Sequence, residues 1–378
     1  MKRQLLGVAA ILLSISTYAQ DNPLWMRYCA ISPDGTTIAF TYKGDIYTVP
    51  STGGRASQIT TNPAHDTKPI WSPDGKKIAF ASDRMGSMDI FEVNKEGGIP
   101  KRLTTHSGNE TPVAYKDAGH ILFLANIMPT VEDAQFPSGQ FQQVYEVNTE
   151  GGRPALFSSM PMEDISINHT GNTLLYHDKK GYEDPWRKHH TSSITRDIWL
   201  CSLNGNRTFR KQTAFNGEDR TPVWASDDKS FYYLSEEKGS FNIFKRDIDG
   251  NTSKQITNHT KHPVRFLSAA SNGTLCYGYD GEIYTVKEGA IPQKVQISIV
   301  TDKNDKDLIR QIKRSGATEI SLSPDAKEIA FVLRGDVYVT STEYSTTKQI
   351  TNTPQQERDI HFSPDGRSIV YASERNGL

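Results

Sequence analysis

A short unit recurs along this chain, and the repetition constrains the fold more than any other feature of the sequence. In its clearest copy the unit reads Ser-Pro-Asp-Gly at 32–35, Ile-Ala-Phe at 38–40, Asp-Ile-Tyr at 45–47 and Gln-Ile-Thr at 58–60. The same motifs return 40 residues later and again from Ser323, and a further copy starts at Ser363.

Weaker copies fill the space between the clear ones and begin at Tyr115, Asn168, Trp224 and Ser271. Every complete copy holds four strand-like runs separated by turns, because Pro, Asp and Gly suit successive positions of a tight turn. Four strands every 40 to 57 residues are typical of the blades of a β-propeller. A helical solenoid is excluded, because no long stretch has a 3.6-residue apolar period.

Six units run from about Met26 to Val300, and they predict an all-β fold, a six-bladed β-propeller of four-stranded blades. The first unit begins with its own first strand, so no spare N-terminal strand is left to complete the last sheet. We therefore expect the ring to close by packing between its first and last blades rather than through a shared sheet.

The rhythm of the repeat breaks after the sixth unit. From 302 to 314, eight of thirteen residues are charged, which is typical of a solvated linker or a short surface helix. We expect a propeller over 20–300, a charged linker over 301–318, and the first one and a half blades of a second, truncated propeller over 319–378. One larger ring with a long loop is the alternative, although loops beyond ~15 residues are uncommon inside a compact domain.

The last residues of the sequence, 372–378, match 81–87 of the second unit, where another strand follows two residues later. A chain that ended here would leave half a blade with an open apolar edge. We therefore expect this sequence to be a fragment of a longer protein.

The first 19 residues have the pattern of a secretory signal peptide. Lys2 and Arg3 precede an apolar run over 5–15, and Thr-Tyr-Ala at 17–19 offers a cleavage site. The run is shorter than the ~20 residues that a membrane span needs, which argues against the alternative, a permanent anchor. We expect cleavage after Ala19, no membrane span in the mature chain, and an exported, periplasmic protein.

Charge and cysteine content exclude several kinds of partner and site. Lys and Arg total 43 against 44 Asp and Glu, so the formal net charge of -1 gives no general attraction to nucleic acid. Cys29, Cys201 and Cys276 are too few for a disulfide framework and lack metal-site spacing. Each lies in a strand-like apolar run, which favours buried free thiols, although export would also permit one disulfide and one free thiol.

Local chemical motifs are mostly missing from the sequence. It has no Gly-x-Ser-x-Gly elbow, no His-Glu-x-x-His and no phosphate-binding glycine loop. His189 and His190 form the one adjacent histidine pair, and Glu183 or Asp184 could complete a metal site. A polar loop is the favoured interpretation, because neighbouring histidines on a loop cannot by themselves enforce metal geometry. The Asp residues of the Ser-Pro-Asp-Gly motifs are expected to form turns.

The repeated pattern resembles the TolB-type, WD-like propeller repeat over nearly all of the mature chain. A six-bladed ring close to the N-terminus, followed directly by another ring, is similar to the tricorn protease family. That resemblance implies a serine peptidase whose catalytic residues lie in later domains, so we expect no catalytic residue, metal or cofactor in this chain. It implies oligopeptides and the missing C-terminal domains as partners, with the propeller guiding or filtering peptides and scaffolding the assembly, and it allows a homo-oligomer. The archetype of the family is cytoplasmic, and the signal peptide departs from it.

Two other resemblances stay open: a TolB-like periplasmic protein-binding scaffold, and the propeller of a prolyl-oligopeptidase-type peptidase. Against the first, no separate domain precedes the first unit, and the repeats exceed one six-bladed ring. Against the second, such enzymes carry a single ring before the hydrolase. The residues after Leu378 would separate the three, by a PDZ domain with a serine-peptidase core, an early stop, or a Gly-x-Ser-x-Gly elbow.

Two neighbouring units carry long insertions between their second and third strands, over 126–142 and 179–196. Loops in this position emerge on the face where successive blades connect, because strands alternate in direction. Simple tolerance of insertions is the alternative explanation for their length. We expect aromatic residues in these insertions to contact peptide or the missing domains, at Phe136, Phe141, Tyr182 and Trp186.

Overall fold

The computed structural model describes residues 23–126, 141–182, 184, 186, 191–300, 315–344 and 346–376. The chain divides into two compact units, Met1–Val300 and Thr301–Leu378, which are described separately below. Throughout the described ranges the regular secondary structure consists of β-strands, as the all-β prediction requires.

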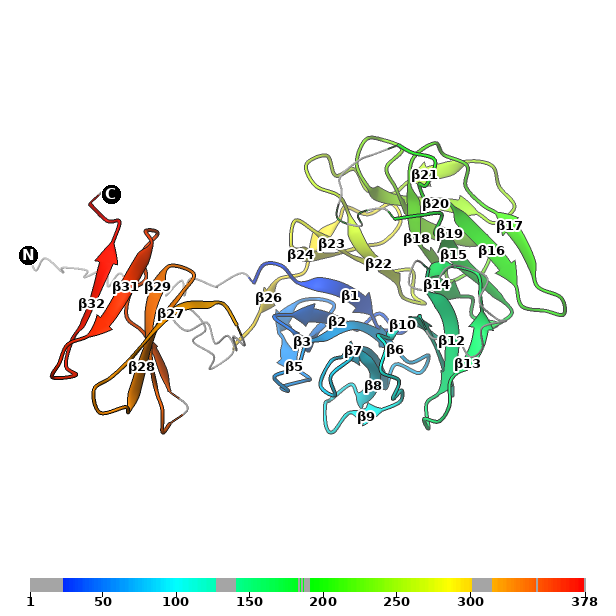
Figure 1. Cartoon of the computed structure of the whole chain (residues 1–378). Coiled ribbons are helices and arrows are strands. Elements are labelled where there is room, and N and C mark those ends of the chain that lie inside the picture. Colours follow the sequence, from blue (N-terminus) through cyan, green and yellow to red (C-terminus); the bar gives the residue numbers. More distant parts are fainter. Residues whose placement is uncertain are drawn as a thin grey trace, which may run out of the picture. The chain divides into compact units, whose positions relative to one another are not determined.

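The first unit contains six four-stranded antiparallel sheets, and each pairs four strands in chain order (Figure 1). The first strands of neighbouring sheets contact one another around the middle of the unit, and the fourth strands lie outside. The sheets are β1 (Arg27–Ile31), β2 (Thr37–Tyr42), β3 (Asp45–Pro50) and β5 (Ser57–Gln58); β6 (Asp66–Trp71), β7 (Lys77–Ser82), β8 (Asp89–Asn94) and β9 (Lys101–Arg102); β10 (Thr111–Asp117), β11 (His120–Ala125), β12 (Gln143–Asn148) and β13 (Ala155–Ser158); β14 (Met162–Ile167), β15 (Thr173–Asp178), β16 (Ile198–Ser202) and β17 (Thr208–Lys211); β18 (Asp219–Trp224), β19 (Ser230–Ser235), β20 (Asn242–Asp247) and β21 (Ser253–Gln255); β22 (Arg265–Ala269), β23 (Leu275–Tyr279), β24 (Glu282–Val286) and β25 (Gln293–Lys294).

The Ser-Pro-Asp-Gly motif closes the turn between the first and second strands. The Ser32 hydroxyl donates to Asp34 Oδ1 at 2.6 Å, and the same oxygen accepts the backbone N–H of Thr36 at 3.0 Å. Hydrogen bonds from Ser32 and then from the Thr36 backbone lower the pKa of the Asp34 carboxyl. The same Ser-to-Asp bond recurs at Asp74, Asp325 and Asp365. The prediction that these aspartates are turn formers is therefore confirmed.

The Asp-Ile-Tyr and Gln-Ile-Thr motifs are linked by one repeated hydrogen bond. The Thr60 hydroxyl oxygen accepts the backbone N–H of Ile46 at 2.9 Å, and Thr60 Oγ1 lies 3.4 Å from Asp45 Oδ1, to which it donates. Equivalent backbone bonds reach Thr104, Thr213, Thr257 and Thr351. This hydrogen bond holds the residues after the fourth strand against the start of the third strand, beyond the last residues that the two strands pair.

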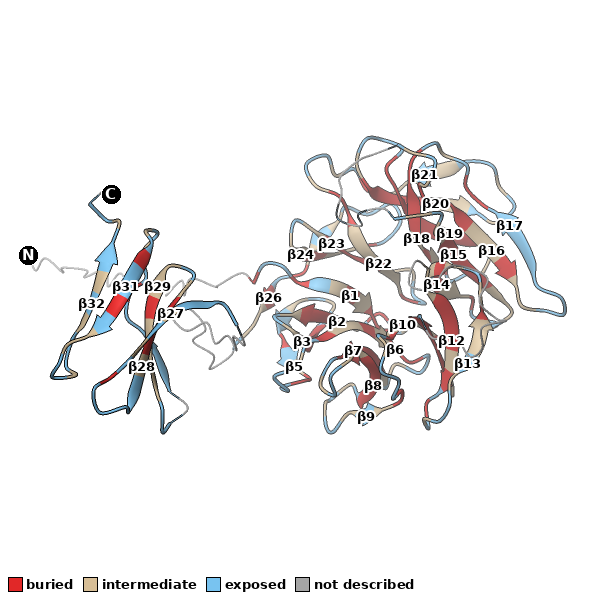
Figure 2. Cartoon of the chain, in the orientation of Figure 1, coloured by how far each residue is buried: buried red, intermediate tan, exposed pale blue. Residues whose placement is uncertain are grey.

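Apolar side chains fill the spaces between sheets, and in Figure 2 many residues in the strands of the first unit are coloured as buried. Six separate cores lie in the first unit, and five of them pack between two sheets that follow one another in the chain. The sixth core joins the first and the sixth sheet, through Ile38 and Phe40 on β2 and Cys276 and Ile283 on β23 and β24. The six sheets therefore share six cores, as expected for a β-propeller.

The first and sixth sheets are also joined by backbone pairing, which we did not expect from the sequence. β26 (Ile297–Ser298) runs parallel to β4 (Gly54–Arg55). The Gly54 N–H donates to the Gln296 carbonyl at 2.8 Å, and the Ala56 N–H donates to the Ser298 carbonyl at 2.9 Å. The two four-stranded sheets stay separate, and this short parallel pair adds to the packing between them.

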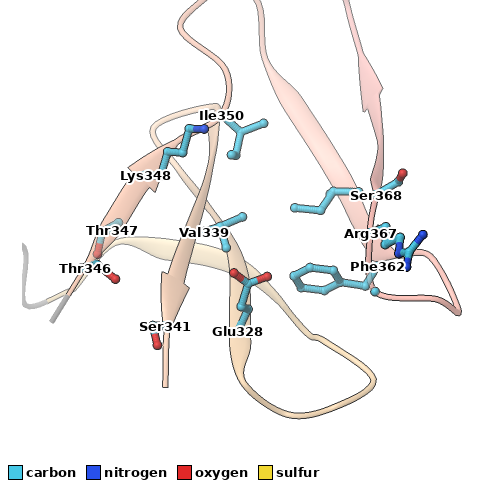
Figure 3. A pocket seen from close by; sticks show the side chains of 12 residues that line it. Glu328, Val339, Ser341, Thr346, Thr347, Lys348, Ile350, Phe362, Arg367 and Ser368 are labelled. Carbon is cyan, nitrogen blue, oxygen red and sulfur yellow. The ribbon is translucent and has the colours of Figure 1, made fainter. Parts of the chain in front are cut away.

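The second unit repeats the same sheet once and then begins another. Its strands are β27 (Ala317–Leu322), β28 (Glu328–Leu333), β29 (Asp336–Ser341) and β30 (Thr347–Gln349) in one sheet, and β31 (Glu357–Phe362) and β32 (Ile369–Ser373) in a pair. A pocket of about 450 Å³ lies between them, where Val339 and Ile350 face Phe362 (Figure 3). Residues 301–314 of the expected linker lie outside the described residues.

Candidate binding surface of the first unit

The insertion of the fourth sheet places Trp186 over the first strands of two other sheets. The insertion connects β15 to β16, yet the Trp186 ring lies 6.1 Å from the Phe266 ring, in an edge-on arrangement. The Arg27 guanidinium lies 4.9 Å and the Arg265 guanidinium 5.1 Å from the centre of the same indole. This loop therefore reaches β1 and β22, the first strands of the first and sixth sheets.

Two hydrogen bonds hold the backbone of Trp186 in this position. Arg265 Nη2 donates to the Trp186 carbonyl at 2.8 Å, and the Trp186 N–H donates to Asp184 Oδ1 at 2.8 Å. A cation over an indole face adds about 0.5–1 kcal/mol at an exposed site. Together these contacts fix the direction of a side chain that is still 44% exposed.

Arg27 is held by aromatic faces. Its guanidinium lies 4.9 Å from the centre of Trp186 and 5.9 Å from the centre of Trp25, an indole that is 71% exposed. Within the described ranges, no carboxylate comes within ion-pair distance of Arg27. We refer to Trp25, Arg27, Trp186, Arg265 and Phe266 as the Trp186 cluster.

The first strands carry an unusual backbone next to this cluster. Five of the six have a register shift at a residue with a positive φ that is not glycine, a conformation that side chains with a Cβ rarely adopt. Their side chains touch across neighbouring sheets: Tyr28 and Phe266 rings lie 4.8 Å apart, Lys68 Nζ lies 5.7 Å from the Tyr28 ring, and Thr221 Oγ1 donates to Asp164 Oδ2 at 2.7 Å. The five residues are Tyr28, Lys68, Asp164, Thr221 and Phe266.

A charged network lies beside the cluster, between the fourth and fifth sheets. Glu163 accepts from Lys179 at 2.7 Å and contacts His177 at 3.2 Å. Burial acts to raise the pKa of Glu163, but the hydrogen bond from His177 and the charges of His177 and Lys179 outweigh it and hold the pKa far below its usual range. Arg196 Nη1 donates to Glu218 Oε1 at 2.8 Å. The network positions the insertion, because Lys179 and Arg196 stand at its two ends.

Buried carboxylates with raised pKa values lie elsewhere in the unit. Burial raises the pKa of Glu110 to about 7, a hydrogen bond from Thr104 opposes this, and the neighbouring Asp89 adds to it. Burial likewise raises the pKa of Asp219 to about 7. Both residues lie inside junctions between sheets. Among the described residues, no group of three or more His, Cys, Asp or Glu side chains is placed to hold a metal ion.

The residues predicted from the sequence are only partly brought together. Trp186 belongs to the cluster, and Tyr182, four residues earlier, is 86% exposed. Phe141 lies just before β12 and is half-buried. Phe136 lies outside the described residues, as do Glu183, His189 and His190 of the metal hypothesis.

Sequence analysis missed the two arginines of the cluster, although a signal for them exists. Arg27, Arg220, Arg265 and Arg358 occupy the same position in four copies of the repeat, near the start of the first strand. Neither the turn motif nor the strand pattern requires a positively charged residue at the start of the first strand, so its recurrence is a separate signal. Arg27 and Arg265 contact Trp186, whereas Arg220 and Arg358 lie within ion-pair distance of Glu218 and Glu374.

Comparison with known proteins identifies relatives over most of the chain. The family described as the tricorn protease N-terminal β-propeller domain matches residues 23–290. Tricorn protease homolog 1 of Streptomyces coelicolor is 25% identical over 365 residues, 94% of this chain and 32% of its own length. The tricorn protease homolog of Saccharolobus solfataricus is 26% identical over 296 residues, 74% of this chain and 26% of its own length.

A solved structure of a tricorn protease has the same fold as this chain. The two align with a TM-score of 0.66 at 18% sequence identity, over 94% of this chain and 36% of the other. The chain thus spans about a third of the length of the relatives that match nearly all of it.

Proposed function

The chain belongs to the family of tricorn protease N-terminal β-propeller domains, and from this membership we propose that it is the non-catalytic propeller part of an exported tricorn-like serine peptidase. In this role it guides or filters oligopeptides and scaffolds the assembly. The observation that carries the proposal is the Trp186 cluster, in which two guanidinium groups and exposed indoles meet beside the inner strands.

The chemistry of the cluster suits a peptide segment. Indole faces pack against apolar side chains and proline rings, and guanidinium groups donate to backbone carbonyls and carboxylates. The surface is open, since Trp25 and Tyr182 are largely exposed. The same chemistry would accept a segment from another domain of the parent protein, which is the scaffolding role.

We propose that the first unit is a closed six-bladed ring. The six intersheet cores support this, because one of them joins the sixth sheet to the first. The turn before the fourth strand supports it as well. A Cβ on Gly53 would lie 2.6 Å from the carbonyl of Gln296, on the segment that follows the sixth sheet, and Gly97 faces Ile59 of the preceding sheet in the same way, at 3.7 Å.

The domain boundaries follow from the same reasoning. We propose a propeller over 20–300, a linker over 301–318, and the beginning of a second propeller over 319–378. The chain divides into two compact units after Val300, which supports the first boundary. The second unit repeats the hydrogen bond of the turn motif and the hydrogen bond from the third strand to the threonine after the fourth, which supports the last boundary.

The proposal of export rests on the sequence. The signal peptide over 1–19 lies outside the described residues. Among those that are described, no helix is long and apolar enough to cross a membrane. Mass spectrometry of the purified mature protein would test the cleavage after Ala19, because an intact N-terminus would contradict it.

The function is tested by removing the indole at the centre of the cluster. In the full-length protein, Trp186→Ala should raise the KM for short peptides several-fold, with an unchanged melting temperature. Phe209→Ala is the matched control, because Phe209 lies on the outer strand β17 of the same sheet and is 40% exposed. Equal peptide turnover and equal assembly in both variants and the wild type would contradict the proposed role of this surface.

A further inference from the structure

Two of the three thiols meet at the junction between the first and sixth sheets. Cys29 lies on β1 and Cys276 on β23, and both belong to the core that joins these sheets. The Ser268 hydroxyl lies 3.5 Å from the Cys29 carbonyl and 3.4 Å from the Cys276 carbonyl, and it can donate to either. One hydroxyl between the two backbones means that the strands come close at these two residues.

The side chains of both cysteines are buried in this shared core, where the Cys29 thiol donates to the carbonyl of Phe266, two residues before Ser268 on β22, at 3.4 Å. Cys276 is fully buried, and Cys29 is 4% exposed. Burial first, and then the hydrogen bond and charge interaction with the Cys29 thiol, raise the pKa of Cys276 well above its usual value. Cys201 lies apart from them, in the core between the third and fourth sheets. All three are free thiols in this structure.

We propose that Cys29 and Cys276 form a disulfide that locks the first sheet to the sixth when the chain folds in the presence of a low-molecular-weight disulfide. One thiolate attacks the oxidant, a mixed disulfide forms, and the second thiolate displaces the remaining thiol of the oxidant. The two cysteines lose two protons and two electrons, and the oxidant is reduced to two thiols. This proposal goes beyond the peptide role and does not depend on it.

The position of the bond determines its effect. A disulfide between strands that are far apart in the sequence restricts the unfolded chain strongly, so it stabilises the folded state. The disulfide would also join the first sheet to the sixth covalently, whereas these two sheets otherwise hold together through packing and a few hydrogen bonds. The thiolate is the reactive form, and burial disfavours it, so the bond should form before the junction closes.

The test uses the whole chain without its first 19 residues, unfolded, reduced and refolded with a mixture of reduced and oxidised glutathione. Free thiols are alkylated under denaturing conditions, and tryptic peptides are analysed by mass spectrometry. We expect a linked pair of peptides containing Cys29 and Cys276, with Cys201 alkylated. The oxidised protein should melt several degrees above the reduced one.

Serine variants separate this bond from other effects of oxidation. The difference in melting temperature should vanish in Cys29→Ser and in Cys276→Ser and persist in Cys201→Ser. Three alkylated thiols in refolded wild-type protein, or a linked peptide that contains Cys201, would overturn the proposal. The peptide analysis of the wild type decides the question even where a serine variant fails to fold. Material secreted through the natural leader provides the same readout if refolding is inefficient.

Discussion

The backbone N–H of Ile31 donates to the hydroxyl of Ser268 at 3.1 Å, and this bond joins the first sheet of the chain to the sixth. The same position of the repeat makes the same bond elsewhere, from Trp224 to Ser166 at 3.3 Å. The junction between the first and sixth sheets therefore uses the contacts found between sheets that are neighbours in sequence. In the closed ring that we propose, substitutions at this junction should disturb the whole unit, because every other junction would depend on it.

Gly53→Ala should destabilise the first unit more than the same change in a neighbouring sheet. Its φ is +90°, and a Cβ would lie 2.6 Å from the Gln296 carbonyl. Gly97→Ala is the matched control, because φ is +94° there and the nearest atom is 3.7 Å away. Both variants carry the cost of a left-handed alanine, about 1 kcal/mol, and only the first adds a backbone clash of roughly 1–3 kcal/mol. Urea unfolding measures the difference, and equal losses would mean that the junction does not close as described.

Arg265→Ala should release the insertion that carries Trp186. The change removes a hydrogen bond to the Trp186 carbonyl and one of the two cations over its ring. A protease should then cut between 182 and 191 several times faster, with little change in the melting temperature. Arg210→Ala, on the outer strand β17 and paired with Asp249, is the control. Identical cleavage of the two variants would argue against a role for Arg265 in holding the loop.

The sequence predicted the local parts of this fold because each of them depends on neighbouring residues. Ser32 and Asp34 are two positions apart, and Thr60 and Asp45 belong to one unit. The repeat also predicted four-stranded sheets in chain order, which the structure confirms. The charged linker and the closed ring stay predictions.

The candidate surface could be predicted only in part, because it depends on contacts between distant units. Trp186 stood out as an aromatic residue in a long insertion, but the insertion belongs to the fourth sheet and its partners to the first and sixth. No local rule says how far such a loop reaches across a face. The pairing of β26 with β4 could not be predicted for the same reason, since only two residues on each strand form it and neither pair has a strand pattern.

The stability of the first unit should fall as the pH rises through neutrality. The pKa of Glu110 is near 4.5 in the unfolded chain and about 7 in the folded one. The folded state therefore holds this proton more tightly, so its contribution is complete below about pH 4.5 and is lost as the pH rises to 7. Asp219 acts in the same direction. The melting temperature should drop by several degrees between pH 5 and pH 8, roughly the effect of a few kcal/mol.

Glu110→Gln should reduce that drop, because a neutral side chain has no proton to lose. Asp89, Arg102 and His106 lie around this carboxyl, and the substitution changes none of them. Glu96→Gln, at an exposed carboxylate in the turn between β8 and β9, is the control and should leave the slope unchanged. A slope that is the same in Glu110→Gln and in the wild type would assign the pH dependence to other groups.

Limited proteolysis should cut this chain first between 302 and 314. Eight of these thirteen residues are charged, and such a segment offers few apolar contacts to protect it. The product should be a folded core that ends near Val300, which mass spectrometry and circular dichroism can identify. A core that survives only with 319–351 attached would favour one larger ring over two.

Residues 20–378 alone should have no peptidase activity. Peptide hydrolysis through an acyl-enzyme needs a nucleophile, a base within hydrogen-bond reach and an oxyanion hole, and such a set is usually unique in a protein. The serines at 32, 72, 323 and 363 instead recur, and each donates to the aspartate of its own turn. The full-length protein should cleave short peptides with a serine nucleophile that lies after Leu378, and fluorogenic peptides would measure both proteins. Turnover by the purified fragment, abolished by one Ser→Ala change within this chain, would overturn the assignment of the propeller as a non-catalytic part.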